Sequence, residues 1–236
     1  MQNKTFNIAI DGPAGAGKST IARMVAEKLG FVYVDTGAMY RAIALYLLRT
    51  GVNPEDPDAV SEAVRDAQIT IRYQDGVQRV LLNGEDVSGL IRTEQVGNTA
   101  SAVSVYPPVR AHLLDLQRRL AASADVLMDG RDIGTCILPD ADTKIFLTAS
   151  PHVRALRRYK ELAEKGAACN LDKIEQDIME RDERDRNREI APLREAPDAV
   201  VLDSSEMTIA QVVQAILDAA VAHGLPKERI REGGVE

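Results

Sequence analysis

The chain has 236 residues, 45% of them hydrophobic, which suits a large α/β domain with a sizeable core and argues against a disordered polypeptide. Its 29 basic and 36 acidic residues leave a net charge of −7, which disfavours a general nucleic-acid-binding surface but allows local basic clusters. Cys136 and Cys169 form neither a disulfide framework nor a metal-binding spacing, so a reducing compartment fits. There is no signal-peptide core at the start and no apolar run of about 18 residues, so we expect a cytoplasmic protein without a membrane span.

The first predicted elements are a strand, a glycine-rich turn and a helix. The strand covers residues 6–10, and Gly12 to Ser19 match the phosphate-binding pattern G-x-x-x-x-G-K-[ST]. In such a loop, backbone N–H groups point at phosphate oxygens, the lysine reaches the β and γ phosphates, and the hydroxyl contacts magnesium. We therefore expect Lys18 and Ser19 to bind ATP or GTP with Mg²⁺. The alternative, an ordinary glycine-rich turn, is disfavoured by the flanking strand and helix.

Further apolar runs alternate with helical patterns, which predicts a parallel sheet of about five strands covered on both faces. The remaining predicted strands are 31–34, 126–128, 144–147 and 199–202, and the remaining predicted helices are 38–49, 108–122, 151–165, 172–188 and 208–223. Hairpin signals at Asp75-Gly76 and Asn83-Gly84 interrupt the alternation, so we expect an antiparallel β insertion at about residues 52–100. The polar residues 226–236 are expected to fray.

Candidate ligand-binding residues follow the strand at 126–128, at the sheet edge where open α/β sheets bind ligands. Arg131 suits phosphate oxygens and Asp132 suits an exocyclic amine. Asp129 is a candidate for a place beside magnesium. A turn with a surface ion pair is the alternative interpretation of these residues.

A second candidate segment, residues 35–41, follows the strand at 31–34. Thr36 either caps the next helix or touches a ligand, because a hydroxyl serves both roles. Arg41 is either a ligand contact or an exposed arginine.

The most charged stretch is residues 180–189, and its mixed signs are typical of a solvated helix face. On a helix, however, Arg181, Asp185 and Arg188 share one stripe, which indicates a second interpretation as a ligand-facing surface. Another arginine cluster lies upstream: Arg154, Arg157 and Arg158. So many guanidinium groups in an acidic chain suit a reaction that brings two polyanions together.

The three histidines lie outside all of these motifs: His112, His152 and His223. No histidine is therefore predicted to act as a general base. An acceptor that is itself a phosphate needs none, since its second pKa is near 6, whereas a sugar or alcohol acceptor does.

Together these motifs resemble the bacterial cytidylate kinases, the P-loop nucleoside monophosphate kinases that phosphorylate CMP and dCMP. The resemblance covers nearly the whole chain and rests on residues 12–20, 35–41, 84–88, 129–134, 180–188 and 202–204. It implies a three-layer α/β/α P-loop NTPase fold. It also implies a single kinase domain, 1–236, made of a core (1–51, 101–150 and 190–225), a monophosphate-binding insertion (about 52–100) and a lid (about 151–189).

The resemblance further implies direct transfer of the ATP γ-phosphoryl group to CMP or dCMP, with Mg²⁺, by a monomer without nucleic-acid or membrane partners. The implied ATP-binding residues are Gly12, Pro13, Ala14, Gly15, Ala16, Gly17, Lys18, Ser19, Thr20, Arg154, Arg157 and Arg158. The implied CMP-binding residues are Thr36, Arg41, Ser101, Arg110, Arg131, Asp132, Arg181, Asp185 and Arg188. The residues implied to act in catalysis are Lys18, Arg131, Arg158 and Arg188.

Within this set, the residues that resemble the family's clamp on the acceptor phosphate are Arg41, Arg131 and Arg188. Those that resemble its cytosine-binding residues are Ser101, Arg110 and Asp132, and those that resemble its sugar contacts are Arg181 and Asp185. Cytosine offers an N4 amine beside the N3 and O2 acceptors, which complements a carboxylate next to an arginine and a hydroxyl. Uracil would set O4 against Asp132, at a cost of about 10³-fold in a dry site. Many family members have glycine at position 19, so either Ser19 or Thr20 is the closer magnesium ligand. Many also have serine at position 36, where Thr36 keeps the hydroxyl.

Two other functions compete with this interpretation. One is a kinase of another monophosphate or of a small hydroxy acid on the same fold. The other is a nucleotide-dependent switch that works through partners. The chain has no clear guanine-reading Asn-Lys-x-Asp, and its arginine clusters indicate a second phosphate-bearing ligand, both of which disfavour a switch.

Overall fold

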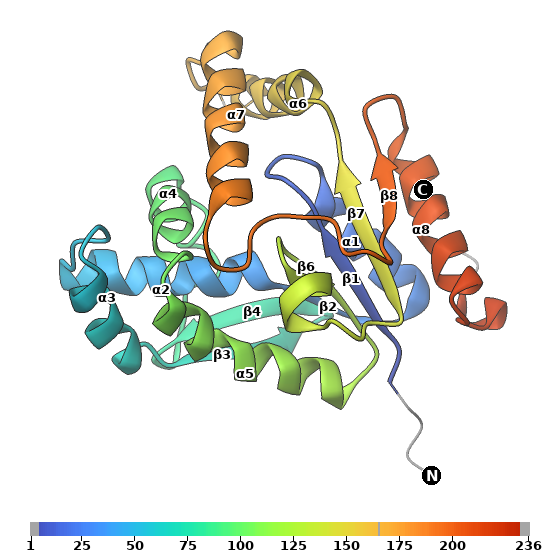
Figure 1. Ribbon diagram of the computed structural model, residues 1–236, viewed down its shortest axis with the longest axis horizontal. Coiled ribbons are helices and arrows are strands. Elements are labelled where there is room, and N and C mark those ends of the chain that lie inside the picture. Colours follow the sequence, from blue (N-terminus) through green and yellow to red (C-terminus); the bar gives the residue numbers. More distant parts are fainter. Residues whose placement is uncertain (1–4, 165, 232–236) are drawn as a thin grey trace.

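The computed structural model describes residues 5–164 and 166–231, which are organised around a five-stranded parallel sheet (Figure 1). The strand order is β2-β6-β1-β7-β8. The strands are β1 (Asn7–Asp11), β2 (Val32–Asp35), β6 (Val126–Asp129), β7 (Thr143–Thr148) and β8 (Val200–Asp203). All neighbours pair in parallel, so the carboxyl ends of the strands meet at one edge.

Helices cover both faces of this sheet. On one face, Ile8 and Ile10 pack with α1 (Lys18–Leu29) and α8 (Ile209–Ala222). On the other face, Ala9 packs with α2 (Thr36–Thr50) and α5 (Pro107–Ser123), and α4 (Glu94–Val103) lies against α2. Successive side chains of β1 thus enter opposite cores, as expected for a strand buried on both sides. The three-layer α/β/α fold is confirmed.

A small antiparallel sheet, β3-β4-β5, forms the expected insertion. Its strands are β3 (Ile69–Gln74), β4 (Val77–Leu82) and β5 (Glu85–Asp86), and they follow α3 (Pro57–Ala63) and the 3₁₀ turn η1 (Val64–Asp66). Both turn pairs have positive φ, at Asp75-Gly76 and Asn83-Gly84, as their sequences predict. The hairpin docks on β2, where the Tyr73 hydroxyl donates to the Tyr33 carbonyl at 3.0 Å.

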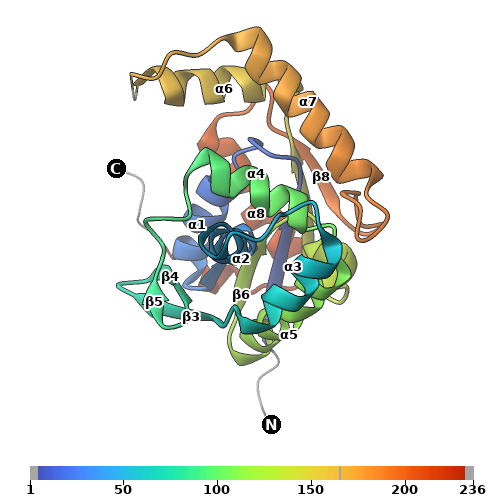
Figure 2. The same ribbon diagram turned by 90° about the vertical axis from the view of Figure 1, so that its left-hand side faces the viewer.

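Two further helices, α6 (Pro151–Glu164) and α7 (Leu171–Asn187), pack on each other and rise beyond the carboxyl edge of the sheet (Figures 1 and 2). Between β6 and β7, the chain forms a short π-helix, η2 (Ile133–Ile137). None of the helices in the described part of the chain has the length and apolar character that a membrane crossing requires.

Most predicted strand and helix ends agree with the structure within about two residues. Arg188 leaves α7 with an extended backbone, so the predicted helix 172–188 is one residue too long, and the last residue predicted for helix 151–165 lies outside the described residues. Both α3 and α4 went unpredicted, and the expected boundary at residue 100 falls inside α4.

The expected fraying is wrong for residues 226–231. These residues form the 3₁₀ turn η3 (Lys227–Arg229) and dock on the core, where the Arg231 N–H donates to the Lys28 carbonyl at 2.8 Å and Arg229 pairs with Asp125 at 2.5 Å. The remaining residues of that prediction, 232–236, lie outside the described part of the chain.

Candidate active site

The glycine-rich loop joins β1 to the first turn of α1 and leaves no room for side chains at its start. Gly12 has φ +148°, and a Cβ there would lie 1.9 Å from the Leu147 carbonyl oxygen of β7. Gly17, with φ 86°, begins α1 without a side-chain cap. The free N–H groups at this helix end therefore face the loop, which is the arrangement that binds phosphate.

Lys18 lies across the loop. The residue is 6% exposed, and its Nζ donates to the carbonyls of Gly12 and Pro13, both at 2.8 Å. Burial, together with the nearby charge of Arg131, lowers the pKa of Lys18. These weak neutral acceptors leave the ammonium ready to exchange them for phosphate oxygens.

Ser19 and Asp129 come together at the ends of α1 and β6. The Ser19 hydroxyl donates to Asp129 Oδ2 at 2.9 Å, and the Tyr33 hydroxyl donates to Oδ1 of the same carboxylate at 2.8 Å. Burial, and then the charge of Asp35, raise the pKa of Asp129 to about 6. The carboxylate is thus ionised near pH 7 and held in one orientation by two hydroxyls.

These oxygen donors fit magnesium. Within the described ranges, no group of three or more His, Cys, Asp or Glu side chains gathers as a self-sufficient metal site. Mg²⁺ keeps several waters and is commonly held by one or two protein oxygens together with substrate phosphates. Ser19, with Asp129 behind it, supplies that kind of partial site beside the phosphate-binding loop.

The helix cap at α2 belongs to Asp35 instead of Thr36. Asp35 Oδ1 accepts from the Ala38 N–H at 2.9 Å, and Oδ2 pairs with Arg92 of the insertion at 2.8 Å. The Thr36 hydroxyl is buried and donates to the Asp129 carbonyl at 2.8 Å. Through this hydrogen bond, Thr36 holds the end of β6 in place.

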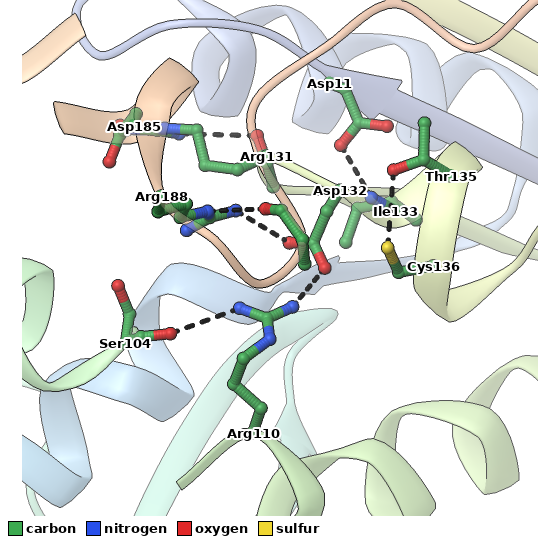
Figure 3. Close-up of polar contacts among 12 residues, drawn as sticks. Asp11, Ser104, Arg110, Arg131, Asp132, Ile133, Thr135, Cys136, Asp185 and Arg188 are labelled. Carbon is green, nitrogen blue, oxygen red and sulfur yellow. Dashed lines mark hydrogen bonds and ion pairs between the residues drawn. The ribbon is translucent and has the colours of Figure 1, made fainter. Parts of the chain in front are cut away.

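A buried cluster of opposite charges lies beside the loop (Figure 3). Asp132 is 4% exposed; one of its carboxylate oxygens pairs with Arg110 of α5, and the other pairs with Arg188 Nη2 at 3.4 Å. The Arg110 guanidinium also lies 5.9 Å from the centre of the Tyr40 ring. Three segments of the chain thus meet at one carboxylate.

A second ion pair joins the loop after β6 to α7, where Arg131 Nε lies 3.1 Å from Asp185 Oδ2. Although burial opposes it, the charges of Arg131 and Arg181 hold the pKa of Asp185 below its usual range. Arg181 is half-buried, and its buried Nε has no hydrogen-bond partner among the described residues. Burial and the charge of Arg131 lower the pKa of Arg181 to about 10.

A cavity of about 360 Å³ lies between α4 and α7 and is lined by Ser101, Asp185 and Arg188, three of the predicted CMP-binding residues. A larger cavity, of about 610 Å³, lies between β2 and the hairpin and is lined in part by Arg23 and Tyr33. The smaller cavity is the better candidate for the acceptor, because the charged cluster borders it and not the larger one.

Arg41 lies apart from this cluster. Its Nη1 donates to the carbonyls of Ile91 at 3.1 Å and Thr93 at 3.5 Å, at the start of α4. Burial, and then the charge of Arg92, lower the pKa of Arg41, with smaller contributions from Arg131 and Arg158. Its guanidinium therefore lies within electrostatic reach of the site arginines.

The three predicted lid arginines occupy different environments. Arg154 is fully buried: it pairs with Asp182 through both terminal nitrogens and donates to the Ala14 carbonyl at 2.9 Å. Arg157 donates to the Ser204 carbonyl at 2.8 Å, and a Cβ on Gly17 would lie 3.9 Å from its Nη1. Arg158 is exposed and pairs with Glu161 at 3.2 Å. The guanidinium of Arg154 thus joins α6, α7 and the loop, and the contact of the three arginines with ATP stays a prediction.

The structure adds two site residues that we did not predict, Tyr33 and Asp11. Tyr33 is hidden in an apolar strand, where nothing in the sequence marks its contact with Asp129. Asp11 precedes Gly12 directly, and that position is the signal that could have identified it. Among the described residues, none of the three histidines forms a hydrogen bond or ion pair with this cluster: His112 contacts Ala67, His152 contacts Glu175, and His223 is exposed.

Comparison of the sequence with known proteins shows the family of the chain. The family profile described as "Cytidylate kinase" matches residues 8–222. A cytidylate kinase of Caldicellulosiruptor saccharolyticus is 49% identical over 215 residues, covering 91% of this chain and 95% of the relative. A cytidylate kinase of Carboxydothermus hydrogenoformans is 47% identical over 213 residues, covering 90% and 96%.

Among solved structures, an uncharacterised protein from Eubacterium ventriosum has a similar fold, with a TM-score of 0.50 and 12% identity over 93% of this chain and 99% of the other. That likeness concerns the fold alone, whereas the profile and the close relatives span the loop, the Asp132 cluster and both α6 and α7. The chain belongs to the cytidylate kinase family.

Proposed function

We propose that the protein transfers the γ-phosphoryl group of ATP to CMP and dCMP, giving CDP and dCDP. The observation that carries this proposal is the buried cluster of Arg110, Asp132 and Arg188 at the same sheet edge as the phosphate-binding loop. The family assignment agrees, since the close relatives are named cytidylate kinases.

Asp132 is suited to read the base. Its carboxylate accepts hydrogen bonds and is held at both oxygens by arginines, so it presents a fixed acceptor to an exocyclic amine. Ser101, on α4, lines the adjoining cavity and supplies a hydroxyl there. Cytosine satisfies this set, while uracil turns an oxygen toward the carboxylate.

Arg131 and Arg188 are suited to hold the acceptor phosphate, and Arg41 completes the clamp if α4 approaches the sheet edge. The orphaned Nε of Arg181 offers a buried donor to a sugar or phosphate oxygen, beside the acceptor carboxylate of Asp185. An acceptor phosphate with a second pKa near 6 is largely ionised at pH 7, so transfer requires positioning and charge neutralisation and no general base.

On the donor side, the loop N–H groups and Lys18 hold the β and γ phosphates, and Ser19 with Asp129 holds magnesium. Mg²⁺ supplies charge neutralisation of those phosphates when bound. Arg157 lies close enough to the loop to contact the ATP phosphates, whereas Arg158 must break its ion pair with Glu161 to reach them. Arg154 acts indirectly by fixing α6 against the loop.

The proposal includes the organisation of the chain. We propose that residues 52–100 form the monophosphate-binding insertion and that α6 and α7 form a lid over the sheet edge, with the remaining segments as the core. A cytoplasmic monomer without nucleic-acid or membrane partners fits this small-molecule chemistry and the net charge of −7.

The test is ADP release by the purified protein with Mg·ATP against CMP, dCMP, UMP, AMP, GMP and shikimate. Fast turnover with CMP and dCMP alone supports both the reaction and the base-reading residues. Turnover with another acceptor keeps the phosphate chemistry but overturns Ser101, Arg110 and Asp132 as cytosine readers. Nucleotide binding with no transfer to any acceptor overturns the kinase proposal and favours a switch.

A further inference from the structure

Asp11 is the last residue of β1 and lies between the two halves of the site. The phosphate-binding loop begins at the next residue, yet the Asp11 side chain points toward the segment that follows β6 (Figure 3). Its two carboxylate oxygens accept from the backbone N–H groups of Ile133 and Gly134, both at 2.7 Å. These are the first two residues of η2, directly after Asp132.

Burial of the Asp11 carboxylate is unfavourable, and the contact with the two N–H groups offsets part of that cost. Asp11 is 5% exposed, and burial raises its pKa to about 6 even though the two N–H groups act to lower it. The first N–H groups of any helix lack partners within that helix, and a single carboxylate satisfies two of them here. Here each N–H group has a carboxylate oxygen of its own, whereas an amide side chain offers one acceptor oxygen and sets a donor in place of the other.

The segment held by Asp11 is the one that carries the proposed base reader. Asp132 has φ −148° and ψ 28°, outside the regular helix and strand regions, so its direction depends on the anchoring of its neighbours. On the other side of Asp11, Gly12 is fixed against Leu147. Asp11 therefore connects two rigidly held backbones, one for each substrate.

We propose that Asp11 is a positioning residue that keeps Asp132 in register with the phosphate-binding loop, so that discrimination between acceptor bases depends on a carboxylate in the donor half of the site. The proposal rests on the base-reading role of Asp132 given under the proposed function. It assigns Asp11 no contact with either nucleotide.

The first variant is Asp11→Asn, which sets an NH₂ group against one of the two backbone N–H donors. We expect the ratio of kcat/KM for CMP to kcat/KM for UMP to fall about tenfold or more, because small displacements of a recognition group have large kinetic effects. The KM for ATP should stay within about twofold. A purely structural role would instead lower stability and reduce turnover of CMP and UMP equally, and an unchanged ratio in folded Asp11→Asn overturns the proposal.

A double-mutant cycle with Asp132→Asn separates this proposal from the one on which it rests. If Asp11 acts through Asp132, the double variant has the same CMP to UMP ratio as Asp132→Asn alone. Independent, multiplying losses contradict the positioning role. If Asp132→Asn alone leaves the ratio unchanged, the base-reading role of Asp132 is itself wrong.

A second variant keeps the test available if Asp11→Asn does not fold. Asp11→Glu keeps the charge and both acceptor oxygens but moves them by one methylene group, so they cannot meet the N–H groups of Ile133 and Gly134 as the shorter side chain does. We expect a smaller loss of the CMP to UMP ratio in the same direction. A folded Asp11→Glu with the wild-type ratio overturns the proposal.

Discussion

The donor and acceptor halves of the site are built in different ways. The donor loop is one continuous segment, and Lys18 bonds to carbonyls only five and six positions away. The acceptor cluster depends on side chains far apart in the sequence, since Arg110 lies 22 positions and Arg188 56 positions from Asp132. The first half is a local backbone structure, and the second exists only when the whole domain is folded.

This contrast has an energetic side. In the proposed function, main-chain N–H groups and one lysine hold the donor phosphates, so the donor half depends little on side chains elsewhere in the protein. The acceptor half uses buried ion pairs, in which removing one partner leaves an uncompensated charge. Mutations in one half should therefore change the kinetics of that half's substrate far more than those of the other substrate.

The largest effect should come from the donor half. Lys18→Ala is expected to lower kcat about 10³-fold or more, because charge stabilisation supplies most of the acceleration in phosphoryl transfer. Steady-state ADP release measures this change. The thermal melting temperature is the control, and near-wild-type turnover in a folded Lys18→Ala protein contradicts the role of Lys18.

In the acceptor half, Asp132→Ala should reduce kcat/KM for CMP about 10²-fold to 10³-fold and leave ATP affinity within about twofold, because the buried cytosine amine loses its acceptor. Initial rates with each substrate varied in turn measure both quantities. Equal losses for ATP and CMP would show that the two halves are not separable.

Arg154 tests whether a predicted donor contact is instead a structural ion pair. Arg154→Ala leaves Asp182 buried without its partner, and we expect a loss of about 3–5 kcal/mol in the free energy of unfolding. Urea denaturation measures this loss. Arg158→Ala is the matched control, because that arginine is exposed and should cost less than about 1 kcal/mol. Similar stabilities for the two variants would contradict the assignment.

The smallest effect concerns the carboxylate beside Ser19. Because the pKa of Asp129 is raised to about 6, the folded protein binds this proton more tightly than the unfolded chain does, and ionisation destabilises the fold as the pH rises from about 4 to 6. The stability of the wild type relative to Asp129→Asn should therefore fall by roughly 1–3 kcal/mol between pH 4 and pH 7.

The control for this pH effect is Asp203→Asn, followed by the same urea titrations. The Ser205 hydroxyl and N–H hold the pKa of Asp203 below its ordinary value, so its contribution changes only below about pH 4. The difference between wild type and Asp203→Asn should stay flat between pH 4 and pH 7. A flat profile for Asp129→Asn as well would contradict the buried, ionisable state of Asp129.

The same contrast explains what the sequence could reveal. The loop, the five core strands and the hairpin turns follow from local patterns, such as the glycine spacing and Asp75-Gly76 with positive φ. Helix α4 was missed because its apolar positions are few and its packing on α2 is a tertiary effect. Arg110 was predicted only through the family resemblance, and no local pattern brings Arg110 and Arg188 to one carboxylate.

Side-chain partners were the hardest to foresee. The spacing of Arg154, Arg157 and Arg158 gives no sign that one is buried against Asp182 while another is exposed. In the same way, a hydroxyl at a strand end suits a helix cap, yet Asp35 caps α2 and Thr36 bonds to the carbonyl of Asp129. These outcomes depend on distances between elements that the sequence does not encode locally.

The most direct test of the account is a crystal structure of the protein with CMP and ADP bound. We predict that the cytosine N4 amine donates to the Asp132 carboxylate, with the CMP phosphate between Arg131 and Arg188 and the ADP phosphates on the N–H groups of the loop. A cytosine ring bound elsewhere, with Asp132 still engaged only by Arg110 and Arg188, would contradict the division of the site into these two halves.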